Sequence, residues 1–196
     1  MSEKNDDAEE IMEGITLGPV LFSAEAISAR VREVSAEIDR DYGPRIDSGR
    51  EVFLVSVLKG SFIFLADLIR CLRLPVVIDF LAISGYGERG TSAGVRILKD
   101  LSEGIRGRDV LVVEDIVDTG LTLSYILRNL EARGPESIRV CTFLDRAAKR
   151  IVPVEVHYRC FEVGEEFVVG YGLDYGQKWR NLPYVCVLRG REVPAT

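Results

Sequence analysis

Hydrophobic positions along the chain form short apolar runs separated by longer amphipathic stripes. The apolar runs lie at residues 52–58, 76–84, 110–113 and 137–146. Such continuous runs are typical of strands that are buried on both faces of a parallel sheet. Two further segments, 95–101 and 152–164, have a weaker strand pattern. We therefore expect a sheet with buried central strands.

The amphipathic stripes predict three helices between these strands. Ser23 is the expected N-cap of the first helix, and Gly43-Pro44 is expected to end it. Apolar residues recur at the three- and four-residue spacing of one helix face: Ile27, Val31, Val34 and Ile38 in the first helix, Phe62, Leu65, Ile69 and Leu72 in the second, and Leu123, Ile126, Leu127 and Leu130 in the third. Alternating strands and helices predict an α/β domain with a mainly parallel sheet.

The run at 110–113 ends in two carboxylates, Glu114 and Asp115, and Asp118-Thr119-Gly120 then leads into the third helix. In an open α/β sheet, such a turn lies at the carboxyl ends of the strands, where ligands bind. Free N–H groups at a helix start, together with the helix dipole, favour a phosphate. Gly120 allows close approach of the backbone, and Thr122 adds a hydroxyl.

A phosphate site next to three carboxylates suggests a ligand that carries both a phosphate and hydroxyl groups, such as a phosphorylated sugar. The alternative is an ordinary turn whose acidic side chains are simply solvated. The turn has neither the GxGxxG fingerprint of dinucleotide-binding folds nor the GxxxxGK[ST] pattern of a P-loop.

Composition limits the classes of protein and of partner. The 196 residues are 47% hydrophobic, enough for one core, and we expect a single domain at residues 13–196. Residues 1–12 are acidic and are expected to form a disordered tail. The net charge of −6 argues against a general nucleic-acid partner.

No 18-residue apolar span exists, and the N-terminus is not signal-like, so we expect a cytoplasmic protein without a membrane partner. The four cysteines, Cys71, Cys141, Cys160 and Cys186, have no C-x-x-C spacing. Three of them lie in strand-like apolar surroundings, which favours buried free thiols over metal ligands or disulfides.

The turn sequence VVEDIVDTGLT (112–122) resembles the phosphoribosyl-pyrophosphate-binding motif of the type I phosphoribosyltransferases. More narrowly, the chain resembles the hypoxanthine(-guanine) phosphoribosyltransferases. The matching segments, in order, are 54–70, 83–87, 96–101 and 166–185. The similarity extends from about Leu17 to Leu188. It implies the type I phosphoribosyltransferase fold: a mainly parallel twisted sheet flanked by helices, with a small hood built from the two chain ends.

The resemblance also implies a reaction, in which 5-phosphoribosyl diphosphate and hypoxanthine or guanine give the nucleoside monophosphate and pyrophosphate. The 5′-phosphate would be held by Asp118, Thr119, Gly120, Leu121 and Thr122. Glu114 and Asp115 would bind the ribose hydroxyls or, in part, the metal. Asp118 would be the catalytic base that takes the N7 proton of the purine.

Lys59-Gly60 follows the strand at 52–58, and by resemblance it would bind pyrophosphate through a loop with a cis peptide at Leu58–Lys59. Arg180 would bind the same group, because guanidinium matches phosphate geometry. Asp174 would bind Mg²⁺, a hard cation that prefers carboxylate oxygens. The alternative for Lys59 is a side chain whose charged end only reaches solvent.

For the purine, the resemblance implies that Phe167 stacks on the base and that the main chain of Val168 contacts its edge. Relatives usually have a lysine at the position of Arg146, and that lysine donates to the purine O6. We expect Arg146 to do so here; the alternative is that Arg146 points to solvent and that Lys149 or another residue serves the base. Without the resemblance, Phe167 would be a core residue next to a surface loop.

The glycine-rich segment 84–94 is longer than two strands need for a simple connection. By resemblance it is a mobile lid, with Ser84 and Tyr86 covering the substrate and excluding water. The resemblance also implies a homodimer or homotetramer. The remaining alternative is a regulatory protein of the same fold that binds the sugar diphosphate without catalysis. The presence of Lys59, Asp118, Asp174 and Arg180 favours the enzyme.

Overall fold

The computed structural model describes residues 14–84 and 96–190. The expected tail at 1–12 and most of the expected lid, including Tyr86, lie outside the described residues. The elements in chain order are β1 (Ile15–Phe22), α1 (Ala24–Asp47), β2 (Val52–Leu58), α2 (Phe62–Cys71), β3 (Val76–Ser84), β4 (Arg96–Lys99), β5 (Asp109–Val117), α3 (Leu121–Glu131), β6 (Ser137–Asp145), η1 (Ala147–Lys149), β7 (Tyr158–Glu162), β8 (Val168–Val169) and β9 (Val185–Gly190).

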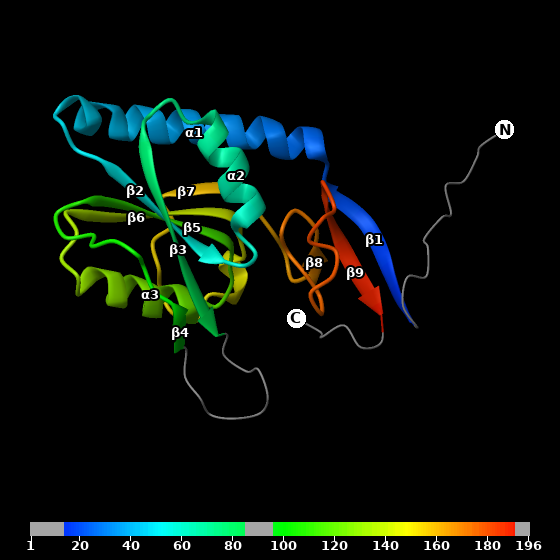
Figure 1. The fold of residues 1–196 in the computed structure, drawn as a ribbon. Helices are drawn as coiled ribbons and strands as arrows, with labels where there is room; N and C mark the ends of the chain where they lie inside the picture. Colours follow the sequence, from blue (N-terminus) through cyan, green and yellow to red (C-terminus); the bar gives the residue numbers. More distant parts are fainter. Residues whose placement is uncertain (1–13, 85–95, 191–196) are drawn as a thin grey trace.

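The main sheet has six strands in the order β4-β3-β2-β5-β6-β7. All neighbouring pairs are parallel except β3 and β4 at one edge. Helices α1 and α2 cover one face of this sheet and α3 covers the other (Figure 1). The predicted fold class, a mainly parallel sheet flanked by helices, is therefore confirmed.

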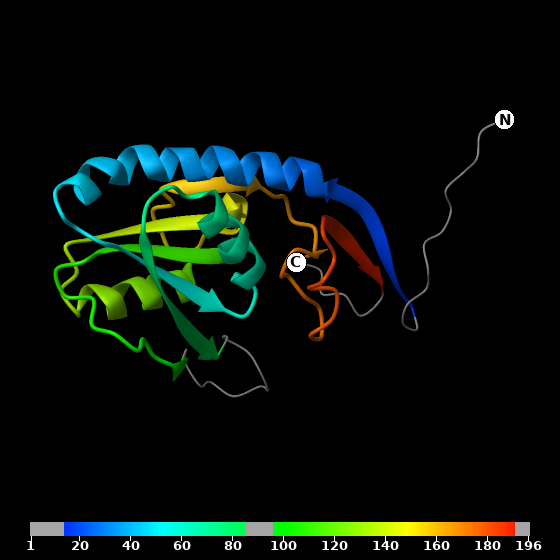
Figure 2. The ribbon, with the colours of Figure 1, turned by 45° about the horizontal axis from the view of Figure 1, so that its top comes forward.

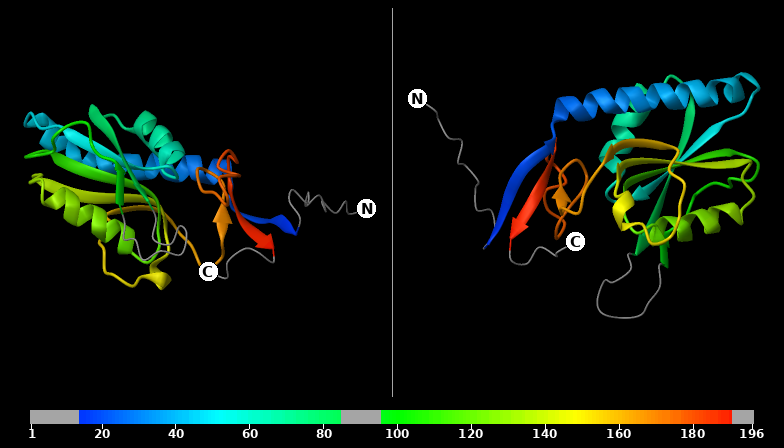
Figure 3. Two further views of the ribbon diagram at one scale, coloured as in Figure 1. Left: turned by 60° about the horizontal axis from the view of Figure 1, so that its bottom comes forward. Right: turned by 180° about the vertical axis from the view of Figure 1, so that it is seen from behind.

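A second, three-stranded sheet has the order β1-β9-β8 and is antiparallel throughout. It brings the two ends of the described chain together, and we call it the hood. Helix α1 starts beside the hood, after β1, and extends along the main sheet to the end at which β2 begins (Figure 2). Seen from below and from behind, the hood lies at the end of the main domain to which the arrow of β2 points (Figure 3).

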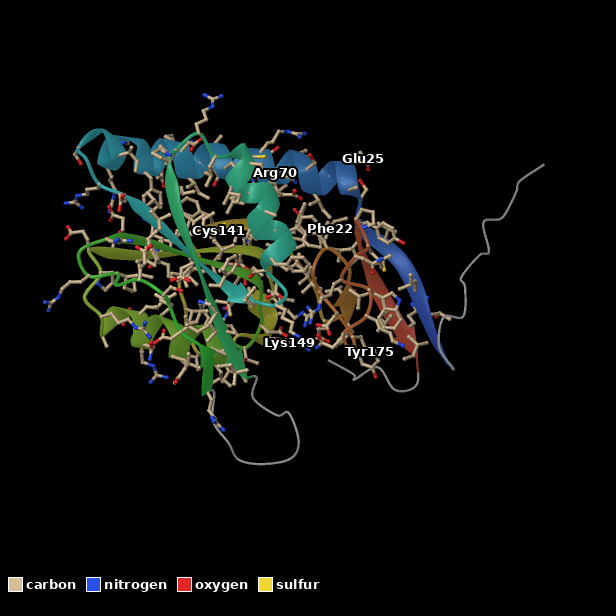
Figure 4. All side chains as sticks on the ribbon, viewed as in Figure 1. Phe22, Glu25, Arg70, Cys141, Lys149 and Tyr175 are labelled. Atoms are coloured by element: carbon tan, nitrogen blue, oxygen red, sulfur yellow. The ribbon has the colours of Figure 1, made fainter. Side chains whose placement is uncertain are left out.

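Three hydrophobic clusters hold these layers together. One fills the space between the main sheet and helices α1 and α2, a second lies under α3, and a small third cluster lies in the hood. Cys141 belongs to the first of them, and Figure 4 shows it in the interior below α1. Phe22, at the junction of β1 and α1, stacks on Phe161 of β7 with ring centroids 4.1 Å apart, which links the hood to the main sheet.

Helix α1 does not end at Gly43-Pro44 as predicted, because it continues to Asp47 with Pro44 inside the helix. A proline in a helix costs one backbone hydrogen bond, but contacts of the last turn favour the longer helix. Arg45 donates hydrogen bonds to the buried Asp109 and to Ser137, and Ile46 packs on the main core.

Other boundaries also differ from the predicted ones. Strand β5 continues through Glu114 and Asp115 to Val117, because it stays paired with β6 along that length. The buried face of α2 consists of Phe64, Leu65 and Leu68, whereas Phe62 is 44% exposed. Only Tyr158–Glu162 of the expected strand segment 152–164 forms a strand.

Cys141, Cys160 and Cys186 are buried free cysteines and Cys71 is partly buried, as expected for thiols in apolar surroundings. Among the described residues, no helix combines the length and the apolar character that crossing a membrane requires.

Candidate active site

A cavity of about 300 Å³ lies where β2 and β5 end, between the first turn of α3 and a loop of the hood. Ten of the residues singled out from the sequence line it: Lys59, Gly60, Glu114, Asp115, Asp118, Thr119, Gly120, Thr122, Asp174 and Arg180. Parts of the chain that are far apart in sequence therefore meet at one site. Its position at the carboxyl ends of parallel strands is the usual place for ligands in such sheets.

The turn at 118–122 forms one wall of the cavity. Gly120 is the N-cap of α3, and the first complete helical hydrogen bond is Ser124 N–H to the Gly120 carbonyl, at 2.8 Å. The N–H groups ahead of that bond lack helical acceptors and carry the positive end of the helix dipole. The Oγ1 atom of Thr119 accepts a weak bond from Leu121 N at 3.4 Å. The turn can therefore bind an anion.

Gly120 has a reason for being glycine that the sequence does not reveal. Its φ is +81°, and a Cβ atom there would lie 2.4 Å from the Val152 carbonyl oxygen. That segment is fixed behind the turn, because Ile151 N and Val152 N both donate to the Thr119 carbonyl. A side chain at Gly120 would therefore collide with the protein itself, whether or not a ligand occupies the turn.

Glu114 and Asp115 form an acidic floor. The Glu114 side chain is buried, and burial, with the neighbouring charge of Asp115, raises its pKa well above the usual range. Burial also raises the pKa of Asp115 to about 6, and the Asp174 charge adds to this while Arg180 opposes it. No described side chain donates a hydrogen bond to the Glu114 carboxylate. Such a floor would be stabilised by hydroxyl donors or by a cation.

The Lys59-Gly60 loop lies next to this floor. The Leu58–Lys59 peptide is cis, as the resemblance implied. Gly60 packs so closely on Asp115 that a Cβ atom would lie 1.4 Å from its Oδ2 atom. The exposed Lys59 donates from Nζ to Oε1 of Gln177, at 3.1 Å. This bond connects the loop to the hood.

The hood contributes Asp174 and Arg180, which form an ion pair at 2.6 Å. Arg180 also donates to the Gly172 carbonyl at 2.7 Å. Gly172 itself touches the first loop, because a Cβ atom on it would lie 2.1 Å from the Gly60 carbonyl oxygen. The hood loop is thus packed directly against the end of β2, with a cation and a carboxylate facing the cavity.

The donor set for a metal is made of carboxylates alone. Glu114, Asp115 and Asp174 all line the cavity, and oxygen donors of this kind suit Mg²⁺. Within residues 14–84 and 96–190, however, no group of three or more His, Cys, Asp or Glu side chains is close enough to hold a metal by itself. Mg²⁺ commonly binds through one or two carboxylates plus substrate oxygens, and the residues present fit that mode.

None of the expected purine residues Arg146, Phe167 and Val168 lines this cavity, although Arg146 contacts Asp118, which does. Arg146 is buried, so the alternative in which it points to solvent is wrong. Its Nη1 atom contacts both carboxylate oxygens of Asp118 at 3.2 and 3.1 Å, and its Nη2 atom donates to the Glu166 carbonyl at 2.8 Å. The segment that precedes Phe167 is thus tied to Asp118 through one guanidinium group.

Phe167 is partly buried, and its ring meets the edge of Tyr175, with centroids 5.6 Å apart. Figure 4 shows Tyr175 in the hood part of the molecule. Val168 is buried in β8 and pairs with Val187. Lys149, also labelled in Figure 4, lies in η1 and is partly buried.

The chain is similar in sequence and in structure to proteins of known family. Residues 21–176 match the family model described as "Phosphoribosyl transferase domain". The hypoxanthine-guanine phosphoribosyltransferase of Mycobacterium avium is 48% identical over 174 residues, which are 88% of this chain and 86% of that protein. The chain belongs to the hypoxanthine(-guanine) phosphoribosyltransferase family.

Solved structures of phosphoribosyltransferases agree with this assignment. A crystal structure of a hypoxanthine-guanine phosphoribosyltransferase from Bacillus anthracis, with HEPES in its active site, has a TM-score of 0.81. It is 38% identical, and the match covers 89% of this chain and 99% of that one. A Trypanosoma cruzi hypoxanthine phosphoribosyl transferase, studied for the role of its C-terminal region in oligomeric state and activity, has a TM-score of 0.82. It is 41% identical, over 88% of this chain and 92% of that one.

The chain is therefore a purine-salvage phosphoribosyltransferase with a type I fold. The expectation of an enzyme, as opposed to a non-catalytic sensor of the same fold, is confirmed by these relatives.

Several residues of this phosphoribosyltransferase site were not found from the sequence. Gln177 connects Lys59 and Arg180, since its Oε1 also accepts from Arg180 at 3.3 Å. Its φ of +68° is a conformation that a side-chain pattern does not reveal. Apolar residues also line the cavity: Val57, Leu58, Ile83, Ile116, Val117 and Leu123. The hydrophobic pattern did not mark any of them as site residues.

Not every expected site residue is brought into the cavity. Leu121 does not line it and is 38% exposed. Ser84 ends β3, and Ile83 just before it lines the cavity, so the expected lid segment begins at the cavity rim. Tyr86 lies outside the described residues.

Proposed function

We propose that this phosphoribosyltransferase transfers the 5-phosphoribosyl group of 5-phosphoribosyl diphosphate (PRPP) to hypoxanthine or guanine, giving IMP or GMP and pyrophosphate. The observation that carries the proposal is the order of groups around one cavity. The anion-binding turn at 118–122 follows the Glu114-Asp115 floor in the chain, Gly60 of the Lys59-Gly60 loop packs on Asp115, and Arg180 of the hood loop also lines the cavity. This order suits a ligand with a phosphate, a diol and a diphosphate.

Each group then has a role. The N–H groups of the 118–122 turn bind the 5′-phosphate, and Glu114 and Asp115 accept hydrogen bonds from the ribose hydroxyls. Lys59, the backbone at Gly60 and Arg180 bind the pyrophosphate. Because Glu114 and Asp115 form no ion pair with a described side chain, hydroxyl donors would relieve the cost of their burial.

In the reaction, N9 of the purine forms a bond to C1′ of the ribose while the bond from C1′ to the pyrophosphate oxygen breaks with its electron pair. The transition state resembles an oxocarbenium ion at C1′. The Asp118 carboxylate takes the proton that leaves N7, which is general base catalysis. Asp118 suits this role, because its side chain is 43% exposed and its carboxylate is held by Arg146.

Mg²⁺ is the proposed cofactor, with Asp174 as its carboxylate ligand and Glu114 and Asp115 as partial contributors. When bound, the ion neutralises charge on the departing pyrophosphate. Arg180 must release Asp174 for this, and the freed guanidinium is then available to the pyrophosphate. Removal of divalent ions with EDTA should abolish turnover, and added Mg²⁺ should restore it.

For the base, we propose that Arg146 donates to the purine O6 and so selects 6-oxopurines. Arg146→Ala should lower kcat/KM for hypoxanthine and guanine together, by roughly 1.5–3 kcal/mol for a charged hydrogen bond. Adenine offers an amino group at that position, and it should be rejected by several hundredfold or more, because buried polar groups would be left mispaired. Phe167 would stack on the base and the main chain of Val168 would contact its edge.

The test is a steady-state comparison of hypoxanthine, guanine, xanthine and adenine, each with PRPP and Mg²⁺, with pyrophosphate and nucleotide both quantified. Stoichiometric IMP or GMP formation supports the proposal. Binding of PRPP without turnover of any base would contradict it.

We also propose that the protein is a homodimer or homotetramer. The support is its likeness to the Trypanosoma cruzi enzyme, whose oligomeric state was examined. Light scattering across a concentration series tests this directly, and a monomer mass throughout would disprove it.

A further inference from the structure

Arg146 is held at two points beyond the end of β6. Its side chain is 4% exposed, Nη1 contacts both Asp118 oxygens, and Nη2 donates to the Glu166 carbonyl. The main chain is fixed as well, since Arg146 N donates to the Val117 carbonyl at 3.0 Å. Val117 directly precedes Asp118. The same residue thus fixes the backbone just before Asp118 and the carboxylate itself.

The guanidinium group is needed for this geometry. Its planar fork presents several donors in fixed directions, whereas the ammonium of lysine is a compact point charge. One terminal nitrogen of Arg146 is used by Asp118 and the other by the Glu166 carbonyl, so two anchors that are far apart in sequence share one rigid group. A lysine side chain ends in a single nitrogen and lacks this fork.

We propose that Arg146 is a positioning residue for Asp118, in addition to any contact it makes with the base. This inference rests on the proposed function, in which Asp118 accepts the N7 proton. Arg146 contacts both oxygens of the Asp118 carboxylate, yet the Asp118 side chain is still 43% exposed, so the carboxylate is held and remains accessible to the purine. The guanidinium group is also anchored at the Glu166 carbonyl, one residue before Phe167. It therefore fixes the position of Asp118 relative to the segment that is proposed to bind the purine.

Two roles of Arg146, recognition of the purine base alone and positioning of Asp118, predict different kinetics for Arg146→Lys. If Arg146 only donates to O6, the lysine of Arg146→Lys still supplies a cation and a hydrogen-bond donor. The substitution should then change mainly KM for the purine base and leave kcat nearly unchanged. If Arg146 positions Asp118, the lysine variant loses the fork. We then expect kcat to fall by roughly 5- to 20-fold, with KM for hypoxanthine changed less than about threefold.

The decisive experiment is a double-mutant cycle on kcat with Arg146→Lys and Asp118→Asn. In the Asp118→Asn background there is no carboxylate left to position, so Arg146→Lys should lower kcat by less than about twofold. Equal fold losses in the two backgrounds would overturn the positioning role. Unchanged kcat in the single Asp118→Asn variant would instead remove Asp118 from the base role, and a wild-type protein that forms neither IMP nor GMP would refute the proposed function, so these failures can be told apart.

Arg139→Lys is the matched control, because Arg139 lies near the opposite end of the same strand. Its Nη1 atom also bridges two partners, Asp41 Oδ2 at 2.9 Å and the Tyr158 hydroxyl at 2.7 Å. The same substitution there should leave kcat unchanged. If Arg146→Lys lacks the native melting transition, the cycle is repeated with Arg146→Gln, whose amide keeps a planar donor without charge. The same non-additivity is expected, and additivity again overturns the proposal.

Discussion

The backbone of Gly60 lies directly against the carboxylate of Asp115. A Cβ atom on Gly60 would lie 1.4 Å from Oδ2 and 2.4 Å from Cγ of Asp115. Gly172 of the hood loop presses on the other side, since its Cβ would lie 2.1 Å from the Gly60 carbonyl oxygen. Three parts of the site are therefore fixed relative to one another by contacts that only glycine permits.

Gly60→Ala should disturb substrate binding, because the added methyl group forces the Asp115 carboxylate to move. We expect kcat/KM for PRPP to fall by roughly 10- to 100-fold, equivalent to about 1.4–2.7 kcal/mol. Steady-state kinetics with each substrate varied in turn measures this. The effect on KM for hypoxanthine should be smaller, because Asp115 is proposed to bind the ribose.

The control for this substitution is Gly104→Ala. A methyl group at Gly104 would have no atom within 4 Å, and this residue needs no left-handed backbone. The kinetics and the melting temperature of Gly104→Ala should therefore match wild type. Wild-type kcat/KM in Gly60→Ala would show that Asp115 has no fixed role in PRPP binding.

Asp118→Asn should preserve the fold and PRPP binding, since the amide nearly keeps the shape of the carboxylate. Loss of the proton acceptor should lower kcat by roughly 10²- to 10⁴-fold, or about 3–5 kcal/mol. Single-turnover measurements at saturating hypoxanthine separate this chemical step from product release. Turnover within threefold of wild type would exclude Asp118 as the base.

The sequence predicted the central strands and the acidic turn because those features are local. An apolar run followed by carboxylates and glycine can be recognised from the local sequence, without knowing which other segments pack against it. The extension of α1 past Pro44 could not be predicted, because it depends on the hydrogen bond from Arg45 to Asp109, which is 64 residues away in the sequence. Strand β1 was also missed: it contains Gly18 and Pro19, which weaken the strand signal, and it forms by pairing with β9.

The site shows the same limit. Pattern and resemblance together identified all six charged residues that line the cavity. The Arg146–Asp118 contact was not predicted, because two side chains that end neighbouring strands can point in several directions. The steric reason for glycine at position 120 could not be predicted either, because it depends on the Val152 carbonyl oxygen, which lies behind the turn.

Asp79 should be important for stability, and its contribution should depend on pH. Desolvation alone would raise its pKa, but hydrogen bonds from the Phe80 and Ser102 N–H groups and the charge of Lys99 outweigh it, so the pKa is lowered below 3.8. A lowered pKa means that the stabilisation is fully present above the unfolded value. It is lost as the pH falls through the lower folded value.

At pH 7, Asp79→Asn should reduce the free energy of unfolding by roughly 1–3 kcal/mol, because buried N–H donors lose a charged acceptor. The difference from wild type should shrink below about pH 4 as the wild-type carboxylate is protonated. Urea unfolding at a series of pH values measures both. Glu51→Gln, which changes an exposed acid just before β2, is the control and should change little.

Buried thiols should be unreactive in the folded protein. Burial raises the pKa of Cys160 to about 12 and the pKa of Cys141 well above its usual range, so the reactive thiolate is scarce at neutral pH. Titration with a thiol reagent at pH 8 should leave these two cysteines unmodified, as peptide mapping would show. All four cysteines should react in denaturant, and rapid modification of Cys141 or Cys160 in the native protein would contradict the burial.

Glu114→Gln should stabilise the fold while it impairs catalysis. Burial and the adjacent Asp115 raise the pKa of Glu114, so the folded state holds its proton more tightly than the unfolded chain does. Stability then falls as the pH rises from the unfolded value of about 4.5 toward the folded value. The neutral amide removes this cost. We therefore expect the melting temperature of Glu114→Gln to exceed that of wild type at pH 8, with little or no difference at about pH 4.5.

Activity and stability of Glu114→Gln should change in opposite directions, so a loss of activity could not be caused by unfolding. If Glu114 accepts a ribose hydroxyl, Gln should lower kcat/KM for PRPP by roughly tenfold, about 1.4 kcal/mol, although the protein is more stable. Glu51→Gln, which changes an exposed acid near β2, is the matched control and should shift neither quantity. A lower melting temperature for Glu114→Gln at pH 8 would mean that this carboxylate has a favourable partner in the folded protein, and a stable variant with full activity would remove Glu114 from the ribose site.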